Sequence, residues 1–477
     1  MPSTFDVLRS TFGDSATVRE AAPADAIDGV QPRYVIEPES AEKLAGLLAW
    51  ASREHVSIVL RGRGTKLGWG RRSGRIDLVA STTRLNRVLA HAHGDLTATV
   101  EAGATVSDLN RELARHGQWL PLQTSFEAAT VGGTIATNES GPLRHRHGTP
   151  RDLLIGVHLA TTDGRLVKAG GNVVKNVAGY DLGKLICGSF GSLAAIVTAT
   201  FKLAPLPAAS TTLVAGFPDR ESLAQAVRAV GASQLEPAAF DVHVALNPTK
   251  AGSHVHEAAN PAEAGSHGRI DSTHSSYVAS GPSTARPELV EGRALGAGFS
   301  RTTESNPPYR LLIQFATTPA AVDAQVEDTC RLFAGADVEV VTGADETDRW
   351  REHARRLWDA AGVIVRVSWL PAALERVIAL VEHIGADGVT SIELAGRAGV
   401  GAGLIRVDAD VAAQVRAVAE LRAKPDVVGH VVVLRADQVV KEGADVWGAP
   451  TDTAGLMRAI KQALDPSGIL NAGRGPI

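Results

Sequence analysis

The sequence predicts an α+β protein with two consecutive mixed domains, and three observations carry this prediction. In the first half, short apolar runs lead into glycine-rich loops, as at residues 57–64, where the backbone is free to approach a ligand closely. In the second half, strands and helices alternate regularly between residues 310 and 434. Between them, Pro205 and Pro207 follow a long apolar strand and mark a domain boundary.

The elements of the first half follow from their periodicity. Up to about residue 30 we expect one short helix and a polar approach. Ser40 is a suitable N-cap for a helix in which apolar residues recur at helical spacing from 44 to 51. A second helix is expected over residues 105–115, closed by Gly117. Strands are expected at residues 34–36, 57–60, 75–79, 96–101, 153–159 and 195–203.

The second half has the strand and helix order of a ferredoxin-like domain built on an antiparallel sheet. Its expected strands are residues 310–315, 338–341, 363–368, 391–394, 404–407 and 430–434, with a further strand near Phe240. Its expected helices are residues 321–333, 346–360, 372–384 and 411–422.

The stretch from Thr130 to Leu193 is the richest in glycines that stand in pairs or beside small residues. Because Asp163-Gly164 reads as a hairpin turn after an apolar strand, we expect these glycines on loops between strands. Loops with inward-facing N–H groups suit a pyrophosphate. A set of tight turns without a ligand explains the glycines equally well.

The loop Gly62-x-Gly64-x-x-x-Gly68 follows a strand, as a variant Rossmann fingerprint would. A Rossmann loop must open a helix. Here Gly70 and Gly74 follow, and then another strand. The sequence therefore argues against a Rossmann domain.

Composition excludes several classes of protein. The formal net charge of -4 and the lack of a basic stripe argue against nucleic acid as a partner. Cys187 and Cys330 alone support neither a disulfide scaffold nor an iron–sulfur cluster in this chain. The sequence contains no run of about 18 apolar residues, so no membrane span is predicted. The N-terminus lacks the pattern of a signal peptide, so we expect the cytoplasm.

Other residue patterns in the sequence do not match a known metal site or catalytic motif. The pairs His91-x-His93 and His145-x-His147 lack carboxylate or thiolate partners at a recognised metal spacing. Lys184 follows a glycine but precedes a leucine, so there is no phosphate-binding P-loop, and no G-x-S-x-G serine elbow occurs. We therefore expect no metal site.

Two runs carry a family resemblance, Gly171-Asn172-Val173-Val174-Lys175-Asn176-Val177-Ala178-Gly179-Tyr180-Asp181-Leu182 and Gly188-Ser189-Phe190-Gly191. They resemble the vanillyl-alcohol-oxidase-like (PCMH-type) flavoproteins, and within them the FAD-binding E subunits of bacterial glycolate oxidase. The resemblance implies an N-terminal approach (1–30), a two-subdomain PCMH-type FAD-binding domain (31–207), a ferredoxin-like cap (208–448) and a C-terminal segment that returns to the FAD domain (449–477).

The resemblance also implies the cofactor and its site. FAD is expected to bind without a covalent link, because the loop at 62–65 has no histidine, whereas covalent relatives often carry one there. The residues expected to hold FAD are Arg61, Gly62, Arg63, Gly64, Thr65, Thr130, Gly132, Gly133, Asn138, Ser140, Gly141, Gly148, Arg151, Asp152, Lys175, Asn176, Tyr180 and Ile196. For Arg151 with Asp152, a turn-stabilising ion pair is the alternative.

The implied activity is oxidation of glycolate, a 2-hydroxy acid, to glyoxylate. The implied partners are a second flavoprotein subunit and an iron–sulfur subunit, which would also allow a place at the periphery of the inner membrane. Relatives that oxidise 2-hydroxy acids usually carry a His-rich motif in the cap, where this chain has His430 alone, as a weak catalytic candidate. A self-sufficient 2-hydroxy-acid dehydrogenase and a non-catalytic assembly subunit are the alternatives.

Residues 247–307 interrupt the family pattern. The segment repeats Ala-Gly-Ser-His and is rich in Gly, Ser, Thr, Pro and His. Such a composition buries too little apolar surface to offset its ordering entropy. We expect a low-complexity insertion that projects from the cap as a loop, and not a metal-binding tract.

Overall fold

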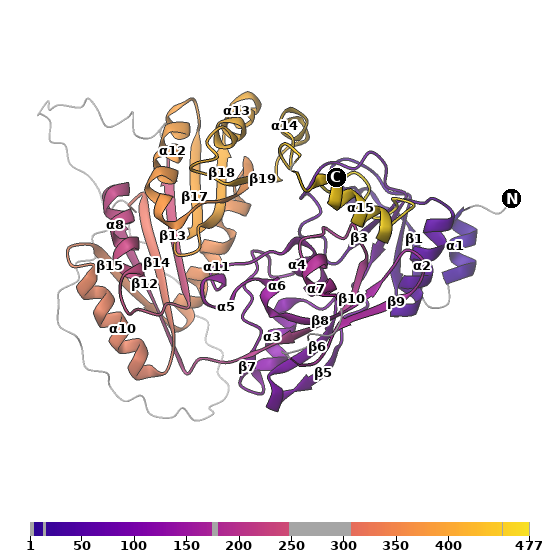
Figure 1. Ribbon diagram of the computed structural model, residues 1–477, viewed down its shortest axis with the longest axis horizontal. Coiled ribbons are helices and arrows are strands. Elements are labelled where there is room, and N and C mark those ends of the chain that lie inside the picture. The colour runs from indigo at the N-terminus through magenta and orange to yellow at the C-terminus, as the bar shows by residue number, and fades with distance from the viewer. Residues whose placement is uncertain (1–3, 13–15, 174–179, 248–306, 451, 477) are drawn as a thin grey trace, which may run out of the picture. The chain divides into compact units, whose positions relative to one another are not determined.

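The first sheet of the computed structural model organises the N-terminal part of the chain (Figure 1). The structure describes residues 4–12, 16–173, 180–247, 307–450 and 452–476. In these residues the strands β1 (Ala16–Glu20), β2 (Tyr34–Pro38), β4 (Leu78–Ser81) and β3 (Ile58–Arg61) lie in that order. Strands β2, β4 and β3 are parallel, and β1 is antiparallel to β2. Helices α1 (Thr4–Phe12) and α2 (Ala41–Arg53) add Leu8, Phe12 and the leucines of α2 to the core of this sheet.

A second, antiparallel sheet follows. Its order is β5 (Val88–Ala92), β6 (Thr97–Glu101), β10 (Ala195–Lys202), β8 (Leu154–Ala160) and β9 (Leu166–Gly170). Helices α3 (Val106–Ala114), α4 (Val131–Thr137) and α7 (Leu182–Ile186) bury their apolar residues in the same core as β6, β8 and β10. The short pair β7 (Gln118–Trp119) and β11 (Ala204–Pro205) and the short helices α5 (Arg144–His147) and α6 (Pro150–Leu153) complete this part.

The cap carries an eight-stranded antiparallel sheet within the described residues, in the order β15-β12-β14-β13-β17-β18-β16-β19. Two βαββαβ units build it. The first is β12 (Ala209–Phe217), α8 (Arg220–Gly231), β13 (Ala239–Leu246), β14 (Tyr309–Thr317), α10 (Pro319–Leu332) and β15 (Asp337–Thr342). The second is β16 (Val363–Ser368), α12 (Leu374–Ala386), β17 (Ser391–Arg397), β18 (Ala402–Asp408), α13 (Val411–Arg422) and β19 (His430–Arg435).

Each unit has the strand order 4-1-3-2 of a ferredoxin-like fold, and β13 pairs with β17 to join the two units. The expected ferredoxin-like cap is therefore a tandem of two such units. Helices α8, α10, α12 and α13 cover one face of the sheet and share its main core. Helix α11 (Gly343–Asp359), which links the two units, packs Trp350 against the other face.

The segment 248–306, expected to be a projecting loop, lies outside the described residues. Its place in the topology is clear, because β13 and β14 on either side of it form an antiparallel pair. The corresponding pair in the second unit, β17 and β18, is joined by the short turn at residues 398–401. The insertion therefore occupies a hairpin position that a few residues suffice to close.

The C-terminal segment lies against the first sheet. After α14 (Gln438–Gly443) and α15 (Ala454–Leu464), Leu470 forms a parallel bridge with Ile58 at the edge strand β3. The amide of Ile58 donates to the carbonyl of Ile469, and that of Asn471 donates to the carbonyl of Ile58. None of the helices in the described part of the chain has the length and apolar character needed to cross a membrane.

Candidate functional site

A pocket lies where the two N-terminal sheets and the C-terminal segment meet, with about 820 Å³ of empty space that includes its open mouth. Small residues dominate its walls, so backbone is close to the space. The lining residues come from four segments, 59–69, 130–137, 190–196 and 471–474, together with Thr82 and Ala102.

Nine of the residues predicted to hold the cofactor line this pocket. They are Arg61, Gly62, Arg63, Gly64, Thr65, Thr130, Gly132, Gly133 and Ile196. The loop at 62–65 fits tightly against Thr130, because a Cβ on Gly62 would lie 2.2 Å from the Thr130 hydroxyl oxygen. The two segments approach so closely at Gly62 that no side chain would fit between them.

The loop after β3 supplies the free donors of the pocket. The backbone N–H groups of residues 62–66 have no hydrogen-bond acceptor among the described residues. Gly64 has a φ of +80°, which most side chains disfavour. A run of unpaired N–H groups beside a pocket is the arrangement that binds phosphate oxygens. This observation favours residues 62–66 as the pyrophosphate loop.

The glycines of the second segment lie elsewhere than the sequence predicts. Gly132 and Gly133 fall in helix α4, not in a loop, and their N–H groups are already used. The amide of Gly132 donates to the carbonyl of Ala102 (2.8 Å), and that of Gly133 to the Thr130 hydroxyl (3.2 Å). A Cβ on Gly132 would lie 2.9 Å from that of Ala102. These glycines thus allow close packing and leave space for a ligand, but they do not donate to it.

Positive charge at the pocket is distributed unevenly. Arg61 donates to Asp25 (2.7 Å), which Arg19 also contacts (2.6 Å). Lys66 pairs with Glu139, and both side chains are buried. Arg63 is exposed and forms no salt bridge in the described part of the chain, although its charge acts on Asp108. Of the three cations in this loop, Arg63 is the one available to a phosphate.

Other predicted residues have structural roles outside the pocket. Asn138 ends α4 in the left-handed conformation (φ +48°), and a Cβ on Gly141 would meet the carbonyl of Gln123 at 2.7 Å. Asp152 accepts from the amide and the hydroxyl of Thr149 (2.8 Å each) and so caps α6. The remaining residues that do not line the pocket are Ser140, Gly148, Arg151 and Tyr180.

The other residues predicted to hold the cofactor lie away from the pocket or outside the described residues. The charge of Arg151 helps to lower the pKa of Asp152, although the two form no salt bridge in the described residues. The Tyr180 side chain is 91% exposed. Lys175 and Asn176 lie outside the described residues. His430 is exposed at the start of the edge strand β19, opposite Ser368, and does not line the pocket.

Two residues that close the pocket from the C-terminal side were not among the predicted site residues, although the family resemblance placed their segment on the FAD domain. Asn471 accepts from the amide of Leu60 (3.3 Å) and donates to the carbonyl of Phe190. Arg474 donates to the carbonyls of Leu67 and Trp69, which fixes the end of the first loop. These contacts join positions 281 to 411 residues apart in the chain, which no local pattern reveals.

One face of the cap sheet contacts the rim of the pocket. Trp69, which lines the pocket, stacks on Trp358 of α11 with ring centroids 5.2 Å apart. The same apolar cluster includes Ile364 of β16 and Ala395 of β17, and Phe190 packs against it. Because side chains alternate along a strand, Arg366 and Arg397 lie on the same face as Ile364 and Ala395.

Three arginines gather at this face with few counter-charges. Burial lowers the pKa of Arg366, and the charge of Arg144 on α5 lowers it further. Burial and the charge of Arg397 likewise lower the pKa of Arg144, against the opposing charge of Asp152. Arg397 lies 3.7 Å from Asp241, whereas Arg144 and Arg366 pair with no carboxylate among the described residues. Such a cluster favours a bound anion.

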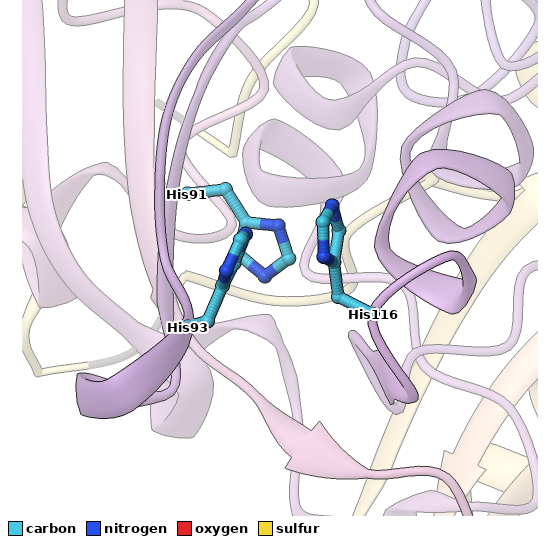
Figure 2. A group of neighbouring side chains, drawn as sticks. All are labelled: His91, His93 and His116. Atoms are coloured by element: carbon cyan, nitrogen blue, oxygen red, sulfur yellow. The ribbon is translucent and has the colours of Figure 1, made fainter.

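The histidine pairs of the sequence differ in their surroundings. His145 packs against Phe240 and His147 against Trp119, so this pair does not converge. His91 and His93 instead lie beside His116 (Figure 2). The spacing of the three histidines in the sequence does not indicate this cluster. This cluster lies apart from the pocket described above, and its own lining residues are distinct.

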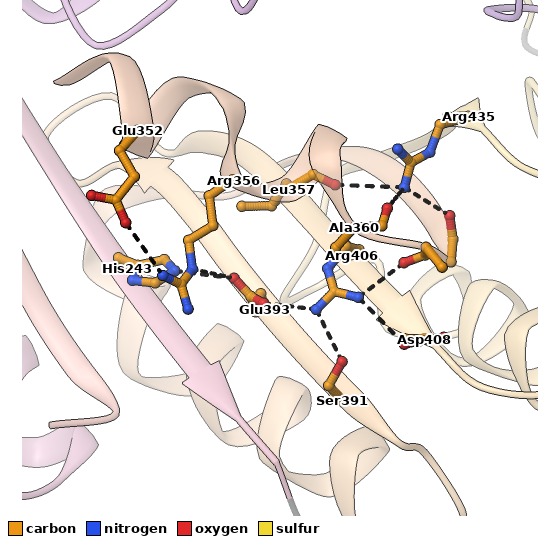
Figure 3. Close-up of polar contacts among 12 residues, drawn as sticks. His243, Glu352, Arg356, Leu357, Ala360, Ser391, Glu393, Arg406, Asp408 and Arg435 are labelled. Carbon is orange, nitrogen blue, oxygen red and sulfur yellow. Dashed lines mark hydrogen bonds and ion pairs between the residues drawn. The ribbon is translucent and has the colours of Figure 1, made fainter. Parts of the chain in front are cut away.

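A polar network anchors α11 to the cap sheet (Figure 3). Glu393 accepts from Arg406 (2.7 Å), Arg356 (3.0 Å) and His243 (3.3 Å). Arg310 donates to Nδ1 of His243 (2.9 Å), so this histidine carries its proton on Nε2 and is neutral. Burial lowers the pKa of His243 to about 4.

This network predicts acid sensitivity of the cap. The pKa of His243 is lower in the folded protein (about 4) than the ordinary value of about 6.5, so the unfolded chain binds the proton more readily. The stabilisation is complete above about pH 6.5 and is lost as pH falls towards about 4, at up to about 1.4 kcal/mol per pH unit. We expect His243→Gln to flatten this dependence in denaturant titrations across that range. His430→Gln, at an exposed site, should leave it unchanged; equal slopes in both variants would contradict the assignment.

The comparisons with known proteins agree with this architecture. Residues 32–170 match the FAD binding domain family, and residues 449–474 match the C-terminal domain of FAD linked oxidases. A solved structure of alkyldihydroxyacetonephosphate synthase superposes with a TM-score of 0.61 at 16% identity, covering 94% of this chain and 77% of the other. At that identity the likeness concerns the fold.

Two curated relatives match the chain over part of its length. Glycolate oxidase subunit GlcD of Bacillus subtilis is 33% identical over 48% of this chain and 50% of its own length. D-lactate dehydrogenase of Archaeoglobus fulgidus is 32% identical over 46% of this chain and 50% of its own length. The chain thus matches about half the length of each of these relatives.

Proposed function

Because the chain carries the FAD binding domain and the C-terminal segment of the FAD linked oxidases, we propose that it oxidises a 2-hydroxy acid with FAD. The expected fold and cofactor are confirmed by these matches and by the shared architecture. The relatives named for glycolate and D-lactate support this substrate class, since both compounds are 2-hydroxy acids.

The backbone N–H groups of the pocket match the needs of the FAD pyrophosphate. The unpaired N–H groups of residues 62–66 and the free cation of Arg63 would hold the pyrophosphate. Gly133 and Ile196 line the space beside them. FAD held there would supply a hydride acceptor for the carbon that bears the hydroxyl group. The residues of this chain position the two reactants and exclude water.

The arginine cluster is the observation that carries the choice of substrate. A guanidinium binds a carboxylate through two parallel hydrogen bonds. Arg366 lies on the cap face that contacts the pocket rim, and the charge of Arg144 on α5 acts on it. Neither arginine forms a salt bridge within the described residues, although the charge of Asp152 acts on Arg144. A small acid with its hydroxyl on the adjacent carbon would place its carboxylate here and its reacting carbon towards the pocket.

Substitution of Arg366 tests this proposal. We expect Arg366→Met to raise the KM for 2-hydroxy acids by roughly tenfold or more, since hydrogen bonds to charged groups contribute about 1.5–3 kcal/mol. The flavin content should stay at the wild-type level. Arg416→Met, at an exposed position of α13, is the matched control. An unchanged KM in the Arg366 variant would argue against anion recognition by this cluster.

The mode of flavin attachment is a separate prediction. Among the described residues that line the pocket, none is His, Cys or Tyr. No side chain is therefore placed there to form a bond to the flavin, and the link is expected to be non-covalent. Acid precipitation should release the yellow colour into the supernatant. Colour retained in the pellet would show a covalent link.

We also propose that the chain works as the FAD-binding subunit of a glycolate oxidase complex. The relative named as a glycolate oxidase subunit supports this reading. With two cysteines in the whole sequence, the chain has no thiolates for an iron–sulfur cluster of its own. A second flavoprotein subunit and an iron–sulfur subunit are the partners that would carry electrons onward.

Two alternatives are separated by simple assays. A self-sufficient dehydrogenase would reduce an artificial dye with a 2-hydroxy acid at full rate as an isolated chain. A complex subunit would do so slowly until its partners are co-expressed. A non-catalytic assembly subunit would contain no flavin after purification.

A further inference from the structure

Three histidines, two from one strand end and one from the end of a later helix, converge on the surface of the second sheet. His91 lies in the edge strand β5, His93 in the turn that follows it, and His116 just after helix α3. One ring nitrogen from each lies within 4.8 Å of the others, and the three rings face a common space (Figure 2). The rings of His93 and His116 stack with centroids 3.9 Å apart.

The backbone that carries these histidines is held in place. Strand β5 pairs with β6, and the turn after it ends at Leu96 in the left-handed conformation (φ +53°). His116 donates its amide to the carbonyl of Leu113 (3.0 Å) at the end of α3. The cluster therefore joins two fixed elements, and the side chains of His93 and His116 are exposed.

Gln118 sets the orientation of His91. The Gln118 amide nitrogen donates to the carbonyl of His93 (2.9 Å), so its oxygen is the atom that contacts Nε2 of His91 (2.9 Å). That oxygen accepts, and Nε2 of His91 must carry the proton. Nδ1 is then the nitrogen with a free lone pair. A hydrogen bond that fixes the tautomer in this way is a regular feature of metal-binding histidines.

We propose that His91, His93 and His116 bind a divalent transition-metal ion, with Zn²⁺ as the best fit. Imidazole nitrogens suit zinc at about 2.0–2.1 Å, and three of them leave a fourth tetrahedral position open. Small rotations of the exposed rings bring the nitrogens to the roughly 3.3 Å spacing that such a tetrahedron requires. The fourth position faces a surface pocket that Asp108 and Glu112 also line, so water completes the coordination.

Zinc binding is tested on the full-length, FAD-loaded protein without a polyhistidine tag. After removal of metal by a chelator, Zn²⁺ is titrated calorimetrically, and bound zinc is measured by elemental analysis. The wild type should bind one equivalent more than the variant H91A/H93A/H116A. His158→Ala, which removes an exposed histidine outside the cluster, should match the wild type. Because other histidines occur in the chain, the difference between variants is the decisive quantity.

Gln118 is assigned as a positioning residue, and its substitution separates positioning from general damage. Gln118→Leu should weaken zinc binding by roughly 10–100-fold while the number of sites stays the same. Flavin content and melting temperature without zinc report whether each variant is folded. If the triple variant fails to fold, His116→Ala alone, at an exposed position, replaces it. Equal zinc stoichiometry and affinity in wild type and cluster variants would overturn the site.

Discussion

Replacing Gly133 by valine is expected to remove FAD from the protein while leaving its fold intact. A Cβ at this position would meet the Thr130 hydroxyl oxygen at 3.1 Å and no other neighbouring atom within 4 Å. Because Gly133 lines the pocket, the two added methyl groups would occupy the space of the ligand. Valine has a higher helix propensity than glycine, so α4 should not weaken.

The expected loss of FAD affinity is roughly ten- to hundredfold, since overpacking costs about 1–3 kcal/mol. Flavin content and a circular dichroism melt measure the two effects separately. Gly74→Val is the matched control, because no atom lies within 4 Å of a Cβ built there. A Gly133 variant with full flavin occupancy would show that the cofactor does not use this part of the pocket.

Breaking the buried pair of Lys66 and Glu139 should have the largest effect on stability. The two side chains are 5% and 6% exposed, and the pair joins the first loop to the segment after α4. Glu139 also accepts from the amide of Ser125 (2.8 Å). Lys66→Met would leave a carboxylate buried without its counter-ion, which costs about 3–5 kcal/mol. Chemical denaturation of the flavin-free protein measures this loss without a contribution from the ligand.

A double substitution distinguishes loss of the pair from loss of packing. Lys66→Met with Glu139→Gln removes both charges and should recover most of the stability. Arg111→Met breaks an exposed pair with Asp108 and should cost about 1 kcal/mol or less. A Lys66 variant no less stable than the Arg111 variant would contradict the role assigned to the buried pair.

The sequence predicted the strand and the glycine-rich loop that line the pocket, because the signals there are local. The strand at 58–61 and the glycines after it lie close together in the chain, and their spacing excluded a Rossmann helix. The structure has that strand, and the loop after it lines the pocket. The cap was predictable in part, because most of its strands and helices were expected. Strand β12 and helix α8 were not expected, so the repeat of the βαββαβ unit could not be recognised.

Helix α4 shows where local reasoning fails. Two adjacent glycines have low helix propensity, which favoured a loop for residues 130–138. Thr130 nevertheless caps the helix by accepting from the amide of Gly133, a signal present in the sequence but outweighed by its glycines. The close contact with Ala102 leaves no room for a larger side chain at Gly132, so glycine is favoured inside the helix. Tertiary packing thus reversed the local preference.

The rest of the site depends on contacts between distant segments. Arg474 reaches Leu67, and the arginine cluster combines α5 of the FAD domain with β16 and β17 of the cap. His116 joins His91 and His93 through the packing of α3 on the second sheet. No spacing in the sequence encodes these distances, so they follow from the fold alone.

An absorbance spectrum of the purified protein under anaerobic conditions tests the central claim most directly. The account predicts the visible bands of oxidised flavin, which should bleach when glycolate or D-lactate is added. The same acids converted to neutral amides should bleach it far less, because the arginine cluster binds the carboxylate. A protein that contains flavin but keeps its spectrum with every 2-hydroxy acid, even with its partners co-expressed, would contradict the proposed function.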